Sequence, residues 1–271
     1  MKNIDQISLS WGVFAESRKK GMRAAEALKE TIDAGYPMIE FVSPPGVFEE
    51  LDSDVREVCS SGIQVWAIHG ILGIGAVSPE AEIRKQAVET AYRFAATCAE
   101  FCPCPLVEHY LDRYLNPEFG RYFQESIASL HEKVAPLGYT LCIETAPYKP
   151  EINERYPDSN EIADFVRSFN SSSLQMIVDF NHSNLHENLS DVARNSAGLV
   201  KSVHISNNRG QRENHLTPDH PEGVIDIGKA FREFREYGYT GACNLEFAFD
   251  DKTTDVPRLR HIREYMENLI K

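Results

Sequence analysis

The sequence LQMIVDFNHSNL, from Leu174 to Leu185, contains the pattern on which the predicted architecture rests. Its apolar run ends abruptly in Asp179, and His182 follows three residues later. A strand that buries its apolar side chains and then presents a carboxylate and an imidazole at its C-terminal tip predicts a ligand site, because burying such groups without a partner is costly. The alternative is that Asp179 caps a helix N-terminus beside a surface histidine.

Three other apolar runs end in the same way. TLCIETAPY contains Glu144, KSVHISNN contains His204, and GACNLEFAF contains Glu246. The intervals are 35 residues from Glu144 to Asp179, 25 to His204 and 42 to Glu246. Each interval has room for a loop, a helix and the next strand, which is the period of βαβ units.

The same alternation extends over the whole chain. Strands are expected at Ile7–Trp11, Met38–Val42, Ile63–His69, Pro105–His109, Tyr139–Glu144, Leu174–Asp179, Val200–Ile205 and Gly241–Phe247. Helices are expected near Met22–Ala34, Val47–Ser60, Pro79–Phe101, Pro117–Leu137, Asn160–Asn170, Leu189–Ala197, Gly228–Tyr237 and Thr254–Ile270. Alternating strands and helices in this number predict an α/β fold, the closed parallel (β/α)8 TIM barrel. A doubly wound open sheet is the alternative, but no G-x-G-x-x-G follows the first strand.

Turn chemistry supports these boundaries. A glycine follows five of the helical runs just before a strand, where a C-cap glycine is expected; these are Gly35, Gly62, Gly138, Gly198 and Gly238. No linker or low-complexity segment divides the chain, so residues 1–271 are interpreted as one domain. Strand alternation places Cys142 on the same face as Glu144, and Ile177 on the same face as Asp179. We expect this pair to form a layer of the barrel beneath the site.

Composition and charge limit the class of protein. With 42% hydrophobic and 25% charged residues, the 271-residue chain is typical of a soluble globular protein. The N-terminal sequence has no apolar signal-peptide core and no run of 18 apolar residues occurs, so a cytoplasmic enzyme without a membrane partner is expected. The net charge of −13 disfavours a broad nucleic-acid surface.

The motifs at the four strand ends resemble a known family. Glu144 in CIETAP, the D-x-x-H of VDFNHSN, His204 in VHISNN and Glu246 in NLEF occur in the order and strand positions of the xylose isomerase-like TIM barrels. That family includes sugar-phosphate isomerases and epimerases, ketose 3-epimerases and inosose isomerases. The similarity extends over nearly the whole chain and is most specific from Tyr139 to Phe247.

The resemblance implies one divalent cation bound by residues of strands five to eight, here Glu144, Asp179, His204 and Glu246. Three carboxylates and one imidazole suit Mn²⁺, which is favoured, or Mg²⁺, and they tolerate Zn²⁺ or Co²⁺. The resemblance also implies that Glu144 and Glu246 stand on opposite faces of a sugar as catalytic acid and base, with an enediolate formed between them. Isomerisation and epimerisation both fit, and the assembly can be a homodimer or a homotetramer.

Further residues are expected to contact the substrate. His182 lies beyond a strand tip, and Arg209 follows His204 by five residues, with Arg212 as a rival for the same role. Arg209 is expected to stabilise negative charge that develops on a substrate oxygen. The loop from Asn207 to Asp226 contains Pro221-Glu222-Gly223-Val224, similar to the family's P-G-x-G but without the second glycine. Its length suggests a lid.

The first half of the chain gives weaker signals. Glu40 ends the second predicted strand and His69 the third, and the family commonly has substrate-lining residues there. Glu108 and His109 both end the fourth strand, and alternation allows only one of them to point inward. His109 is the preferred residue.

Three other functions compete. The strongest is phosphodiester cleavage, since abasic-site endonucleases resemble this fold and use several zinc ions held by strand-three and strand-four histidines, for which His69 and His109 are placed. Against it, their Asp-x-His is absent from the seventh loop: Asp219 and His220 are adjacent, and His215 stands alone. Dehydration of an inosose or keto sugar uses the same metal. A sugar-binding barrel without catalysis is the non-enzyme alternative.

Overall fold

The structure, a computed structural model, describes residues 7–42, 50–111, 117–146 and 156–271. Eight parallel strands close into a barrel in chain order, which confirms the predicted (β/α)8 fold. The strands are β1 (Ile7–Ser10), β2 (Met38–Val42), β3 (Gln64–His69), β4 (Pro105–His109), β5 (Thr140–Glu144), β6 (Leu174–Asp179), β7 (Val200–Ile205) and β8 (Ala242–Leu245). The predicted last strand was too long by one residue at its start and two at its end, because Gly241, Glu246 and Phe247 lie outside β8.

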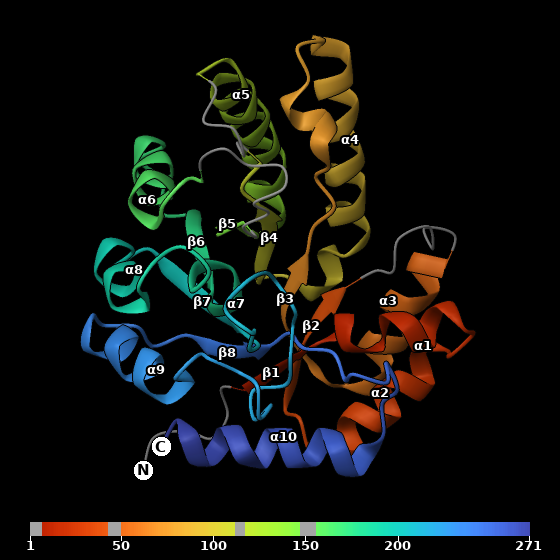
Figure 1. Ribbon diagram of the computed structural model, residues 1–271. Helices are drawn as coiled ribbons and strands as arrows, with labels where there is room; N and C mark the ends of the chain where they lie inside the picture. The colour runs from red at the N-terminus through yellow and green to blue at the C-terminus, as the bar shows by residue number, and fades with distance from the viewer. Residues whose placement is uncertain (1–6, 43–49, 112–116, 147–155) are drawn as a thin grey trace.

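Helices surround the barrel on its outside, as Figure 1 shows. The predicted helices correspond to α2 (Ala24–Asp33), α3 (Leu51–Ser61), α4 (Ala81–Thr97), α5 (Pro117–Val134), α6 (Ser159–Ser168), α8 (Leu189–Asn195), α9 (Ile227–Glu236) and α10 (Val256–Leu269). Two short helices were not predicted, α1 (Ala15–Lys19) and α7 (Phe180–Ser183). Among the described residues, no helix combines the length and the apolar character needed to cross a membrane.

The helices pack through narrow apolar faces. In α9 the residues Ile227, Ala230, Phe231 and Phe234 are all buried, and their spacing of three and four residues places them on one face. Burial of each phenylalanine contributes about 2 kcal/mol of hydrophobic stabilisation. All five glycines predicted to end helices have the left-handed backbone conformation, with φ between 72° and 98°. The helix boundaries therefore follow from local chemistry.

Strand register brings the candidate site residues to one level. His109 pairs with Glu144 across β4 and β5, and Asp179 pairs with His204 across β6 and β7. Two residues earlier on strands β3 to β6, four buried side chains pack together as a small apolar cluster, namely Ala67, Val107, Cys142 and Ile177. The predicted layer of Cys142 and Ile177 is thus confirmed. The site lies directly above this layer, at the C-terminal ends of the strands.

Candidate metal centre

Four side chains from the ends of β5 to β8 converge, and we call them the central group: Glu144, Asp179, His204 and Glu246. One ligand atom from each lies within 4.8 Å of the others. His204 Nδ1 is 3.2 Å from Glu144 Oε1 and 2.9 Å from Glu246 Oε2, so the two glutamates approach the same ring nitrogen. The set of residues predicted to bind a metal is therefore assembled in space.

The donor atoms of the central group fit a cation. Oε1 of Glu144, Oδ2 of Asp179 and Oε2 of Glu246 are buried, and they accept no hydrogen bond of acceptable geometry from the described residues. Buried carboxylate oxygens without partners are costly, and most such atoms in folded proteins are satisfied. A hard divalent cation would satisfy these oxygens together, because carboxylates and imidazole are its common ligands.

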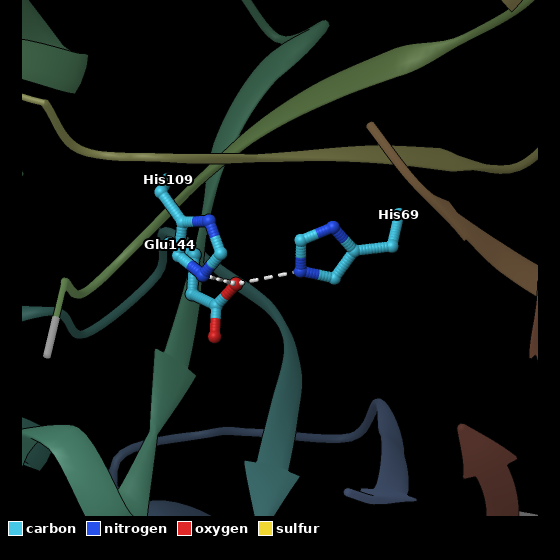
Figure 2. Close-up of side chains that lie close together, drawn as sticks. All are labelled: His69, His109 and Glu144. Carbon is cyan, nitrogen blue, oxygen red and sulfur yellow. Dashed lines mark ion pairs between the residues drawn. The ribbon is translucent and has the colours of Figure 1, made fainter. Parts of the chain in front are cut away.

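A second set, the histidine-pair group, consists of His69, His109 and Glu144. Figure 2 shows both imidazoles pointing at one oxygen of the carboxylate. Oε2 of Glu144 is 3.5 Å from His69 Nε2 and 3.4 Å from His109 Nε2. The other oxygen faces His204, so Glu144 lies between the central group and the histidine-pair group.

A third set, the loop group, consists of His182, Glu213 and His215. Glu213 Oε1 is 2.6 Å from His215 Nε2 and 3.7 Å from His182 Nε2. The sequence interpretation missed Glu213, and it was wrong in leaving His215 alone. The signal in the sequence was the spacing Glu213-Asn214-His215, which is a Glu-x-His in place of the Asp-x-His of the endonucleases.

The loop after β7 folds back on itself to deliver these side chains. Asn207 and Leu216 form an isolated antiparallel bridge, in which each backbone N–H donates to the other's carbonyl at 2.9 and 2.8 Å. His215 has a positive φ of 45°, which turns the chain just before the bridge. The loop that was predicted as a lid thus carries two side chains into the site.

Three imidazoles are fixed by backbone carbonyls. Nδ1 donates to Thr145 O at 2.7 Å in His182, to Gly70 O at 3.2 Å in His69, and to Glu246 O at 3.0 Å in His215. Since a carbonyl only accepts, Nδ1 carries the proton in each ring and Nε2 faces the carboxylates. Metal-binding histidines are commonly held in this way.

Asp179 combines the two roles that the sequence left open. Its Oδ1 accepts a hydrogen bond of 3.0 Å from the backbone N–H of His182, so it caps the short helix α7. Its Oδ2 remains free for the central group. The histidine of the alternative interpretation is not at the surface, since His182 is only 2% exposed.

Electrostatic coupling among these groups is strong. Burial disfavours the charged imidazoles, yet the neighbouring carboxylates raise the pKa of His69 to about 10, of His182 to about 9 and of His215 to about 10. Burial likewise opposes charge on Glu246, but its contact with His204 lowers the pKa of this carboxyl to about 2. Without a cation, charged imidazoles and carboxylates compensate one another in the centre.

The pKa values of one carboxyl and one imidazole in these groups shift in the opposite direction, because burial outweighs the neighbouring charges. Burial raises the pKa of Asp179 to about 6, an effect that the nearby His182 only partly offsets. Burial also lowers the pKa of His109 to about 4. His109 is therefore neutral at neutral pH, the form in which an imidazole can bind a cation.

The remaining predicted contacts lie elsewhere. Glu40 is fully buried, with Oε2 at 2.9 Å from His204 Nε2, so it lies behind the His204 ring instead of lining a pocket. Arg209 is exposed and pairs with Glu222 at 2.7 Å, an arrangement that differs from the predicted substrate contact. Of the fourth-strand pair His109 faces the site, whereas Glu108 accepts a 2.8 Å hydrogen bond from the backbone N–H of Leu72.

The missing second glycine of the seventh loop is accommodated. Asn207 Oδ1 accepts from the backbone N–H groups of Asn208 and Ile225 at 3.0 and 2.9 Å, and a Cβ at Gly223 would overlap the Asn207 side chain. Val224 is 56% exposed, so its side chain needs no space inside the loop. Only the first glycine is sterically required here.

Comparisons with known proteins support the fold. A sequence profile described as Xylose isomerase-like TIM barrel matches residues 28–270. The solved structure of an L-ribulose 3-epimerase shares 18% identity with a TM-score of 0.77, over 98% of this chain and 94% of that chain. A 3-keto-D-glucoside 4-epimerase from E. coli shares 16% sequence identity with a TM-score of 0.75, over 97% of this chain and 98% of that chain. A structure described as AP endonuclease, family 2, from Brucella melitensis shares 19% sequence identity with a TM-score of 0.69, over 89% of this chain and 92% of that chain. No curated protein matches the chain.

Proposed function

This chain belongs to the xylose isomerase-like TIM barrel family, and from that premise we propose that it is a divalent-metal-dependent sugar isomerase or epimerase. The observation that carries the proposal is the position of His204 Nδ1 between the carboxylates of Glu144 and Glu246, at 3.2 and 2.9 Å. Asp179 completes the group. These four residues would hold the cation, which supplies an electrophile that polarises a substrate carbonyl.

The two glutamates are suited to move a proton. In the metal-free protein the charge of His204 lowers the pKa of both carboxyls against the opposing effect of burial, and a cation that displaced the His204 proton would favour the same ionised carboxylates. One carboxylate then removes the proton from the carbon beside the carbonyl, and an enediolate forms on the substrate. Return of a proton to the same carbon from the other face gives epimerisation, and return to the neighbouring carbon gives isomerisation.

The substrate class rests on charge and on the solved structures of similar fold. The net charge of −13 disfavours a long polyanion. The two epimerases named above act on sugars or keto sugars and cover nearly the whole chain. A neutral ketose therefore fits better than a nucleic acid, with His69 and His109 as hydrogen-bonding partners of its hydroxyl groups. Dehydration of a keto sugar requires the same proton removal and is the nearest variant.

Phosphoester hydrolysis is a second candidate, and one observation favours it. The two oxygens of Glu144 face different groups, as a carboxylate that bridges two cations would, and the loop group adds a third cluster of ligand type. If the histidine-pair group bound a cation, both oxygens of Glu144 would be occupied, and this residue would lose its function as a base. The two candidates therefore differ in how many cations the centre holds.

Solvent-exchange measurements test the proposal. The protein is loaded with Mn²⁺ and incubated with a panel of ketoses in deuterium oxide, and deuterium on the carbons beside the carbonyl is followed by NMR. We expect incorporation for at least one sugar, lost in Asp179→Ala. Absence of exchange with every ketose, combined with hydrolysis of a chromogenic phosphodiester, would replace the first candidate by the second.

A further inference from the structure

Glu40, in the middle of β2 and level with Ala67 of β3, has an unusual environment. It is 0% exposed, and its Oε2 lies 2.9 Å from Nε2 of His204, which is also 0% exposed. The other ring nitrogen of His204 faces Glu144 and Glu246. The imidazole is therefore placed between a carboxylate on one side and the central group on the other.

The buried carboxylate of Glu40 has few polar partners in the part of the chain that the structure describes. Neither oxygen of Glu40 receives a hydrogen bond from the described residues. Burying an ionised carboxyl costs several kcal/mol unless a charged or hydrogen-bonding partner compensates for the lost water. Among the described residues His204 is at ion-pair distance, and Glu40 also helps to raise the pKa of the more distant His69. The closest interaction of the buried carboxylate is therefore with a residue of the central group.

We propose that Glu40 is a positioning residue, which holds the His204 ring through its ion-pair contact with Nε2 and so directs Nδ1, as the nitrogen that would bind the cation, into the central group. This inference rests on the proposed function, because it presupposes that the central group binds a cation. A carboxylate behind a metal-binding imidazole fixes the tautomer and the orientation of the ring and strengthens its donor nitrogen. Glu40 thus acts through His204 and not on the sugar.

The chain offers a matched control in Glu108. This glutamate is also buried, with 2% exposure, but its Oε2 accepts from the backbone N–H of Leu72 instead of contacting His204. Glu108→Gln replaces a buried carboxyl group by an amide, as Glu40→Gln does. A loss of metal affinity common to both variants would reflect the general effect of removing a buried carboxylate.

The experiment is a calorimetric titration of metal-free protein with Co²⁺, together with the visible spectrum of the bound ion. For Glu40→Gln we expect binding about 10- to 100-fold weaker and a shifted spectrum, with Glu108→Gln within about twofold of the unmodified protein. Thermal unfolding of the metal-free variants verifies that each is folded. If Glu40→Gln does not fold, Glu40→Asp serves instead, because it keeps the charge but withdraws it by one methylene, and it too should bind more weakly.

Two results would overturn the inference. Unchanged Co²⁺ affinity and spectrum in a folded Glu40 variant, beside normal binding by the unmodified protein, would refute the role of Glu40 and leave the proposed function intact. Absence of Co²⁺ binding by the unmodified protein would refute the metal site on which the proposed function depends, and the role of Glu40 with it. The NMR signals of His204 in metal-free protein give a readout independent of turnover, since its Nε2–H should shift in Glu40→Gln.

Discussion

The central group and the loop group are neighbours, with His182 Nε2 only 3.8 Å from Asp179 Oδ2, but the protein holds them in different ways. Three members of the central group end strands whose register is fixed by backbone hydrogen bonds, and the fourth follows β8 directly. In the loop group, Glu213 and His215 lie in a loop that is held by an isolated bridge between Asn207 and Leu216 and by hydrogen bonds of His215 with Glu246 O and the backbone N–H of Ala248. Their side chains are about a quarter exposed.

This difference teaches which part of the site the barrel itself provides. Strand ends set the positions of Glu144, Asp179 and His204 before any ligand arrives, so the central group is preorganised for chemistry. Loops open at lower free energy than strands. We therefore interpret the central group as the reacting centre and the loop group as the adjustable part of the site, and five predictions test this distinction.

The largest loss of exchange rate is expected for Glu246→Gln, with Glu213→Gln as the comparison. Loss of the proton-transferring carboxylate should reduce deuterium exchange into the substrate by a factor of about 10² to 10⁴. Glu213→Gln changes a carboxylate to an amide in the loop group and should reduce exchange less than about tenfold. The measurement is the initial rate of exchange at saturating Mn²⁺ and sugar. Equal losses in the two variants would remove the distinction between the groups.

The pH dependence of metal binding should be steeper for the loop group. Cation binding needs neutral imidazoles, and neighbouring carboxylates raise the pKa of His182 to about 9 and of His215 to about 10 against the effect of burial. Rising pH removes the competing protons, so affinity increases up to those values, by roughly tenfold per pH unit for each displaced proton. We expect cation binding to displace two protons from the loop group and one proton, that of His204, from the central group.

The stability of the metal-free protein should fall as pH rises, whereas metal affinity increases. The contribution of the His215 imidazolium is complete below its unfolded pKa near 6.5 and is lost as pH rises through about 10. Unfolding temperatures of chelator-treated protein between pH 7 and 10 measure this effect, and titration calorimetry in buffers of different ionisation enthalpy counts the protons. A flat profile in both experiments would show that these imidazoles are neutral in the metal-free protein.

A smaller effect is expected for Gly223→Ala, which acts on the loop alone. The added Cβ would overlap Asn207, the residue that organises the loop after β7. We expect a loss of about 0.5 to 3 kcal/mol in the free energy of unfolding, with weaker cation binding at the loop group and an unchanged first equivalent of Mn²⁺. Val224→Ala, at an exposed position of the same turn, is the control. Loss of the first equivalent in Gly223→Ala would contradict the independence of the central group.

The smallest effect is expected for Arg209→Ala. Its guanidinium is exposed and paired with Glu222, and such surface pairs contribute about 0 to 1 kcal/mol. Exchange rates should change less than about twofold if the arrangement in the structure persists with substrate bound. A fall of a hundredfold in the exchange rate would restore the substrate contact first predicted for Arg209 and would mean that the loop closes over the sugar.

The sequence predicted the barrel and the central group because both depend on local patterns. Apolar runs that end in Glu144, Asp179 and His204 mark strand tips, and parallel strands bring their tips together without further information. Glu213 was missed because its position depends on a bridge between Asn207 and Leu216, which no periodicity reveals. Glu40 was predicted to end a strand, which is wrong because it lies in the middle of β2, and its contact with His204 crosses the barrel and depends on the geometry of the closed sheet.

Metal content per chain is the most direct test of the central claim that one cation in the central group supports the chemistry. Plasma mass spectrometry is applied to protein that is purified without chelators and then loaded with Mn²⁺ or Zn²⁺. We predict one tightly held equivalent that is lost in Asp179→Ala and retained in Glu213→Gln and in His109→Asn. Two or three equivalents that depend on His69, His109 and Glu213 for both retention and activity would contradict the claim, as would the absence of any bound metal.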